Sequence, residues 1–218
     1  MDADRRRAVE KLPPWLPETY QHILGRIHSE DMEMARNALK CLICCSRSLT
    51  LIELAIVIAI RSGRPFNEEE KLDDDELLLQ ILGSLVRLNR LNNIIDLAHF
   101  SVIEYLTTPH LADGTPTLHF IDPEDGHVDI LESCLTYLSF IERDVPGDPG
   151  GNEPQDSFLQ YGTFHWSFHA KQSENNTKSR ELVPTLFKSE NHFANHSEDM
   201  SLILTTFILH IRTFDNSE

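Results

Sequence analysis

The stretch "NRLNNIIDLAHFSVIEYLTT", residues 89–108, decides the fold of this chain. Its asparagine-rich start is typical of a hairpin turn, and "NIIDLA" predicts the strand that returns from that turn. The next residues predict a helix, because Ser101 and Glu104 have the spacing of a capping box and place the start of the helix at about Val102. We therefore expect a β-hairpin followed at once by a capped helix.

Four helices are predicted before the hairpin. Apolar residues recur at helical spacing in "PETYQHILGRIHS" and in "EDMEMARNALKCLICCSR". The third helix, in "SLTLIELAIVIAIRSG", has Thr50 as N-cap with Glu53 at capping-box spacing, and the fourth begins at the acids Asp73 to Asp75. Helices with a small β-hairpin in this order predict a mainly α fold with a winged-helix domain over residues 12–110.

The rest of the chain is predicted to be helical as well. Residues 111–145 form a helical extension, whose expected buried stripe is Ile130, Cys134, Leu135, Leu138 and Ile141. Residues 146–156 are rich in proline, glycine and acids and are expected to be a linker. Residues 157–218 form a C-terminal helical segment that includes the apolar run "SLILTTFILHI". The winged-helix domain is therefore expected to be followed by an α-helical bundle.

The charge of the chain argues against several classes of partner. Its 218 residues include 35 acids against 19 lysines and arginines, a formal net charge of -16, and such a field repels phosphate backbones and anionic lipids. The longest apolar runs are too short for a membrane-spanning helix, and the four cysteines lie in apolar contexts typical of reduced thiols. We expect no nucleic-acid partner, no membrane contact and a cytoplasmic location. A DNA-binding winged helix is a distant third interpretation.

His99 is the candidate binding residue, because it stands just before a predicted helix. Exposed backbone N–H groups and the positive end of the helix dipole favour an anion there and disfavour the imidazolium. A neutral ring in that place can donate one hydrogen bond to a phosphate. The alternative interpretation is structural: His99 fills the corner between hairpin and helix and bonds a carbonyl.

Metal binding and catalysis find weaker support in the sequence. His165 and His169 are four residues apart, a spacing that can bind a metal, but no third ligand or HExxH glutamate accompanies them. Cys41, Cys44 and Cys45 lack a partner CxxC pair and are expected to be buried thiols. The sequence has neither a P-loop nor a G-x-S-x-G nucleophile elbow. We expect no catalytic residues, no metal and no cofactor, and hence a protein that is not an enzyme.

Several blocks in order resemble one fungal architecture. They are "LPPWLPETYQHILGRI", "RSLTLIELAIVIAI", "LAHFSVIEYLTT", "HFIDPEDGHVDILESCLTYLSF" and "FLQYGTFHWSFHAKQ", within residues 12–171. The chain is similar to the helical region after the NACHT nucleotide-binding module of fungal NACHT–ankyrin proteins, which are STAND (NLR-like) switches. The first part of that region is the GPI inositol-deacylase winged-helix domain. The resemblance implies a winged helix that packs on the nucleotide-binding module, with His99 as the nucleotide-sensing residue.

The chain also departs from the full-length pattern of that family. It has no P-loop, and its one ankyrin-like string, "DGTPTLHFIDPEDGHVDIL", has no second copy. The expected function is therefore a non-enzymatic regulatory module that packs on a NACHT module, in cis or in trans, and relays its state to downstream repeats. The alternative is a stand-alone helical adaptor that binds other proteins through apolar helix faces around the third and last helices.

Overall fold

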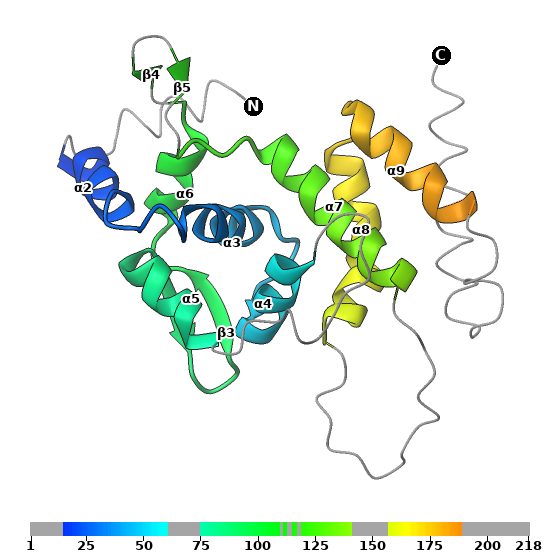
Figure 1. The fold of residues 1–218 in the computed structure, drawn as a ribbon, viewed down its shortest axis with the longest axis horizontal. Helices are drawn as coiled ribbons and strands as arrows, with labels where there is room; N and C mark the ends of the chain where they lie inside the picture. The colour runs from blue at the N-terminus through cyan, green and yellow to red at the C-terminus, as the bar shows by residue number, and fades with distance from the viewer. Residues whose placement is uncertain are drawn as a thin grey trace.

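The computed structural model describes residues 15–60, 75–109, 111–112, 115–116, 119–140 and 157–188 (Figure 1). Within these ranges the chain is mainly helical and contains a small three-stranded antiparallel sheet, which confirms the predicted mainly α class. No helix in the described ranges has the length and hydropathy needed to cross a bilayer. The expected linker at 146–156, the acids at 73–74 and the apolar run at 201–211 lie outside these ranges.

Three helices and a two-residue strand come first along the described chain. They are α2 (Trp15–Leu24), α3 (Met32–Cys44), β1 (Leu49–Thr50) and α4 (Leu51–Ala59). The capping box predicted for α4 is confirmed: the Glu53 backbone N–H donates to Thr50 Oγ1 over 3.2 Å, and the Thr50 N–H donates to the Glu53 carboxylate over 2.8 Å. This reciprocal pair fixes the start of α4 at the end of β1.

A hairpin completes the sheet. α5 (Asp75–Leu82) and the 3-10 turn η2 (Gly83–Leu85) lead into β2 (Val86–Asn89) and β3 (Ile94–Leu97). The predicted hairpin is confirmed, because β2 and β3 pair antiparallel, with Val86 opposite Leu97. At its turn Asn93 has a φ of 54°, a left-handed conformation that asparagine tolerates. The strand order is β1-β3-β2, so the short β1 joins the hairpin through the return strand.

The later helices pack on the earlier ones. They are α6 (Phe100–Thr107), α7 (Pro123–Phe140), α8 (Ser157–Gln172) and α9 (Thr177–Lys188), with the two-residue strands β4 (Leu111–Ala112) and β5 (Thr115–Pro116) between α6 and α7. α7 contacts α3 as well as α8 and α9, and α8 also contacts α4 (Figure 1). α7 therefore lies between the first helices and the last.

One hydrophobic core joins these elements. Its fully buried side chains come from both halves of the chain and include Leu24, Leu54, Ile95, Ile130, Phe158 and Tyr161. The predicted stripe of α7 is confirmed for the four positions that are described, Ile130, Cys134, Leu135 and Leu138, whereas Ile141 lies outside the described residues. The helices after residue 110 thus share their core with the helices before it.

Gly126 allows α7 to approach α3 closely. A Cβ added to it would overlap Cys44 Sγ and would lie 3.1 Å from Lys40 Cγ. The Cys44 thiol also donates a weak hydrogen bond to Pro123 O over 3.7 Å, which holds it against the start of α7. A methyl group at residue 126 therefore requires the two helices to separate or Cys44 to move.

We predict that Gly126→Ala lowers the free energy of unfolding by about 1–3 kcal/mol, the usual cost of overpacking, although alanine is the better helix former. Cys44→Ala removes the overlapping sulfur. The free energy of unfolding of the double variant Gly126→Ala/Cys44→Ala is therefore expected to be higher than the sum of the two single effects predicts. Urea unfolding followed by far-UV circular dichroism measures all four proteins, and strictly additive effects would contradict a direct contact.

Candidate functional site

His99 is the N-cap of α6. Its backbone is extended, with φ -152° and ψ 148°, and its ring Nδ1 accepts a hydrogen bond from the Ser101 backbone N–H over 3.2 Å. Ser101 Oγ lies 2.7 Å from the same Nδ1, and Tyr20 Oη lies 2.6 Å from Ser101 Oγ. Because Nδ1 accepts, a neutral ring has its proton on Nε2. Nδ1 is thus occupied within the protein, and Nε2 is the nitrogen that can donate to a ligand.

The predicted capping box at Ser101 and Glu104 is wrong. α6 begins at Phe100, so Ser101 lies inside the first turn, where its side chain is 2% exposed and contacts Tyr20. The His99 ring nitrogen takes the place of the expected hydroxyl as acceptor for a free backbone N–H. Glu104 is not at the N3 position of a box, because α6 begins at Phe100 with His99 as its N-cap. Within the described part of the chain its buried Oε2 has no hydrogen-bond partner.

Apolar side chains flank His99 on the outside of α6. Phe100 is 61% exposed, and its ring centroid lies 5.5 Å from that of His99. Ile103, one turn further along, is also exposed. We name His99, Phe100 and Ile103 the His99 surface. It combines a ring donor at a helix N-terminus with apolar area that a partner could cover.

A buried ion pair lies where α4 begins. The Glu53 carboxylate is 2% exposed and accepts two hydrogen bonds from the Arg47 guanidinium, over 2.6 and 2.9 Å. This bonding raises the pKa of Arg47. Arg47 Cζ also lies 5.0 Å from the centroid of the Tyr161 ring on α8. The guanidinium therefore connects α4 to α8, through an ion pair on one side and a cation–π contact on the other.

Tyr161 extends these contacts to two histidines. Its Oη accepts from the Ser46 backbone N–H over 3.1 Å and lies 2.8 Å from His169 Nε2. His169 Nδ1 in turn lies 2.9 Å from Nδ1 of His127 on α7. Burial, followed by the charges of His127 and His165, lowers the pKa of His169 to about 3. The ring is therefore neutral, and both of its nitrogens have partners, as a buried histidine requires. We name Glu53, Arg47, Tyr161, His169 and His127 the polar network.

The two histidines with metal-ligand spacing have separate structural roles. His169 bonds Tyr161 and His127, whereas the His165 ring packs on the Tyr161 ring with centroids 4.8 Å apart. Among the described residues no group of three or more His, Cys, Asp or Glu side chains is placed to hold a metal ion.

The cysteines are buried free thiols at three of the four positions. Cys41, Cys44 and Cys134 are buried, as predicted from their apolar context, whereas Cys45, also expected to be buried, is half-buried. Burial raises the pKa of Cys44 to about 12. A thiol that keeps its proton at neutral pH is a poor nucleophile, so these cysteines act in packing.

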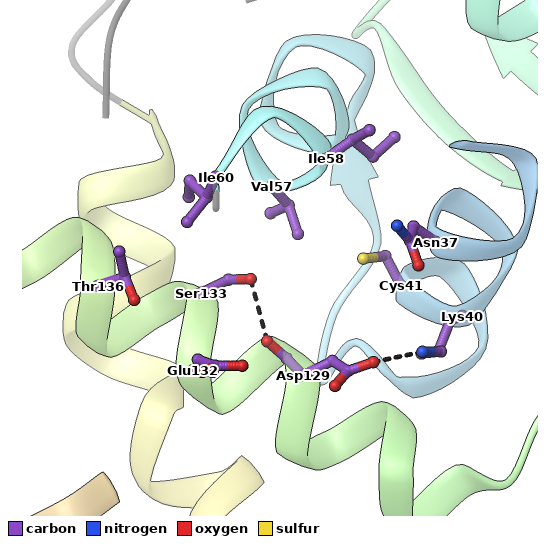
Figure 2. Close-up of a pocket in the computed structure, with 10 residues that line it drawn as sticks. All are labelled: Asn37, Lys40, Cys41, Val57, Ile58, Ile60, Asp129, Glu132, Ser133 and Thr136. Atoms are coloured by element: carbon purple, nitrogen blue, oxygen red, sulfur yellow. Dashed lines mark hydrogen bonds and ion pairs between the residues drawn. The ribbon is translucent and has the colours of Figure 1, made fainter. Parts of the chain in front are cut away.

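A cavity of about 150 Å³ lies between α3, α4 and α7 (Figure 2). It is lined by Asn37, Lys40 and Cys41 of α3, by Val57, Ile58 and Ile60 at the end of α4, and by Asp129, Glu132, Ser133 and Thr136 of α7. Lys40 forms an ion pair with Asp129 across the helices. This site was not foreseen from the sequence, since Lys40 and Asp129 are 89 residues apart and only the packing of α3 on α7 brings them together.

Comparisons with known proteins found one distant similarity. No family model matches the chain, and no solved structure matches it. A curated protein of Monascus ruber, azaphilone pigments biosynthesis cluster protein L, is 26% identical over 138 residues. The match covers 60% of this chain and 29% of the Monascus protein. The chain thus spans less than a third of that relative, and this similarity does not establish a family.

We predict that Arg47→Met destabilises the protein more than the double change Arg47→Met/Glu53→Gln does. The single change leaves a buried carboxylate unpaired, at a cost of about 2–4 kcal/mol, near the low end for a buried pair because Arg47 is partly exposed. The glutamine side chain of the double variant keeps the cap on Thr50 without a charge. Urea unfolding compares the two variants, and a double variant that is less stable than the single one would contradict this account.

Acid is expected to destabilise the protein through the buried histidines. The pKa of His169 is lowered to about 3 in the folded protein and is about 6.5 in the unfolded chain. The unfolded chain therefore binds the extra proton, so the stabilisation is complete above about pH 6.5 and falls by about 1.4 kcal/mol per pH unit down to about pH 3.

The variant His169→Gln is expected to lose the part of the pH dependence of stability that comes from His169. Thermal or urea unfolding between pH 7 and pH 4 should show a shallower slope for His169→Gln than for the natural protein. The exposed His28 supplies the matched control, His28→Gln. Equal slopes in all three proteins would show that His169 takes up its proton without unfolding.

Proposed function

We propose that this chain is the winged-helix and helical-bundle region of a fungal NACHT-type (NLR-like) signalling protein, with a regulatory and not an enzymatic role. It would pack on a nucleotide-binding module, in cis or in trans, and relay the state of that module to downstream repeats. The order of elements supports a winged helix: α3, β1, α4, α5, the β2–β3 hairpin and then α6. In this interpretation the hairpin is the wing and α7, α8 and α9 form the bundle.

The observation that carries the proposal is the position of His99. Its Nδ1 is held by Ser101, so the ring has a fixed orientation, while the residue itself is exposed at the N-terminus of α6. A phosphate oxygen would find there the Nε2 N–H and the positive end of the helix dipole. Phe100 and Ile103 supply apolar area beside the ring for contact with the nucleotide-binding module.

The net charge of the chain favours a protein partner over nucleic acid. Its charge of -16 is repulsive to a nucleic-acid backbone. A bound nucleotide is a different case, because the partner module would supply the cationic groups that hold its phosphates, and this chain would add only the ring N–H of His99. The proposal therefore requires no basic patch on this chain.

A stand-alone protein-binding adaptor is the second candidate. The apolar residues of α4, where the sequence predicted a binding face, are mostly buried within the chain. An adaptor surface is better supported on α8, where Phe164 is 62% exposed and Phe168 is 39% exposed, one turn apart. The coding sequence on either side of the chain separates the candidates. An upstream Walker A motif and downstream repeats would favour the regulatory module, whereas the absence of both would favour the adaptor.

We predict that His99→Ala and His99→Asn both alter nucleotide retention in the protein that the whole gene encodes. His99→Ala also removes the N-cap, at a cost of about 1 kcal/mol, whereas asparagine retains an acceptor for the Ser101 N–H. The release of a fluorescent ATP analogue measures retention, and thermal unfolding measures stability. Normal release from both variants would contradict the sensing role, and altered release only from His99→Ala would assign the effect to lost stability.

A further inference from the structure

Three hydrogen bonds in series connect α7, through α8, to the loop after α3. His127 Nδ1 on α7 lies 2.9 Å from His169 Nδ1 on α8, and His169 Nε2 lies 2.8 Å from Tyr161 Oη. The Ser46 backbone N–H donates to the same Oη over 3.1 Å. His169 and Tyr161 are 0% exposed, whereas His127 is half-buried. We name His127, His169 and Tyr161 the histidine relay.

The donors at the inner end of the relay set its direction. The Ser46 N–H is a fixed donor and occupies one lone pair of the Tyr161 hydroxyl. The Tyr161 proton has two acceptors within reach, His169 Nε2 and the Cys45 thiol. A bare imidazole nitrogen is a much better acceptor than sulfur, so the hydroxyl donates to His169. The proton of neutral His169 therefore lies on Nδ1.

The His169 proton in turn determines the state of His127. His169 Nδ1–H points at His127 Nδ1, which must be bare in order to accept it. Neutral His127 therefore has its proton on Nε2. In this state the direction of donation runs from Tyr161 to His169 and from His169 to His127.

A proton added to His127 is incompatible with that direction. An imidazolium has an N–H on both nitrogens, so its Nδ1 can only donate. His169 must then accept at Nδ1 and hold its own proton on Nε2, from which it donates to Tyr161. The Tyr161 oxygen then accepts from both Ser46 and His169, and its proton turns to Cys45. The relay gains one proton in total, on His127, and both inner groups stay neutral.

We propose that the histidine relay is a proton-controlled switch, in which a proton bound at His127 on α7 reverses its hydrogen bonds and turns the Tyr161 hydroxyl from His169 to Cys45. The effect reaches the loop that contains Ser46, next to the Arg47 that pairs with Glu53 at the start of α4. The proposal goes beyond the proposed function and does not rest on it, because the relay and the His99 surface are formed by different residues.

The neighbouring charges leave the two relay histidines to respond to pH in different ways. Charged groups that reach α7 and α8 from other elements are held in ion pairs, namely Lys40 with Asp129, Arg47 with Glu53 and Lys178 with Glu132. Burial lowers the pKa of His127, and it lowers the pKa of His169 much further, to about 3. His127 is therefore the relay histidine that takes up the first proton. His165, which packs on the Tyr161 ring, also has a lowered pKa, so the test must follow each ring separately.

The test determines the tautomer of each ring. Long-range proton–nitrogen NMR of the protein labelled with ¹⁵N-histidine distinguishes a bare ring nitrogen from one that carries a proton. At about pH 7.5 we expect the proton of His169 on Nδ1 and that of His127 on Nε2. As the pH falls to about 5, His127 should become doubly protonated, while His169 stays neutral and its proton moves to Nε2 with the same midpoint. The amide signal of Ser46 should shift with that midpoint.

Three results would overturn the proposal. They are a His169 proton on Nε2 at about pH 7.5, a His169 tautomer that does not change while His127 titrates, and a His169 ring that becomes charged together with His127.

Two variants sharpen the test. In His127→Asn the side-chain oxygen can replace Nδ1 as acceptor for His169, but the amide takes up no proton in this pH range. His169 should then keep its proton on Nδ1 down to about pH 5, and the shift of the Ser46 amide should be lost. His28→Asn, at an exposed position, is the matched control and should leave both changes intact.

A change of His169 tautomer that persists in His127→Asn would also overturn the proposal. If His127→Asn fails to fold, the tautomers of His127 and His169 in the natural protein still decide.

Discussion

The buried carboxylate of Glu53 fixes how α3, β1 and α4 are joined. An ionised carboxylate that is 2% exposed is tolerated only with a charged partner and further hydrogen bonds. Arg47 supplies the first, and the Thr50 N–H supplies the second. Because Arg47 precedes β1 and Thr50 ends it, satisfying one carboxylate fixes both ends of the short segment that connects α3 to α4. The same segment contributes β1, one of the two edge strands of the sheet.

The constraint extends to the later helices through Tyr161. Its ring lies beneath the guanidinium, and its hydroxyl bonds Ser46 and His169, so α8 has a defined position against the loop after α3. His169 in turn forms a hydrogen bond with His127 of α7. A polar network of this kind adds little net stability over an apolar core, but each partner is costly to remove. The His127–His169 contact forms only when α7 and α8 are in the observed register, so the network favours this arrangement.

Local sequence patterns predicted the helices and strands better than they predicted the contacts between them. The capping box at Thr50 and Glu53 is correct, whereas the same spacing at Ser101 and Glu104 is wrong. The difference is physical: Tyr20, 81 residues earlier, binds the Ser101 hydroxyl, and the neighbouring His99 ring supplies a competing acceptor for the free N–H. The hairpin was predictable because its turn residues and its alternating strands are adjacent in sequence. β1 was not, since two residues carry no periodicity.

The candidate sites divide in the same way. His99 was found from sequence because a position before a helix is a local property, whereas the cavity and the polar network depend on the packing of α3 on α7 and of α4 on α8, and no spacing along the chain reports such contacts.

The His99 surface and the cavity also differ in how far substitutions at their residues disturb the core. The His99 surface lies on exposed positions of α6, a helix that contacts mainly α2 and β3, so substitutions there can alter a partner contact without disturbing the core. The cavity is bounded by three helices that share buried side chains, and a change in its lining also changes their packing. Substitutions at the His99 surface can therefore change its exposed chemistry without altering the packing around the cavity.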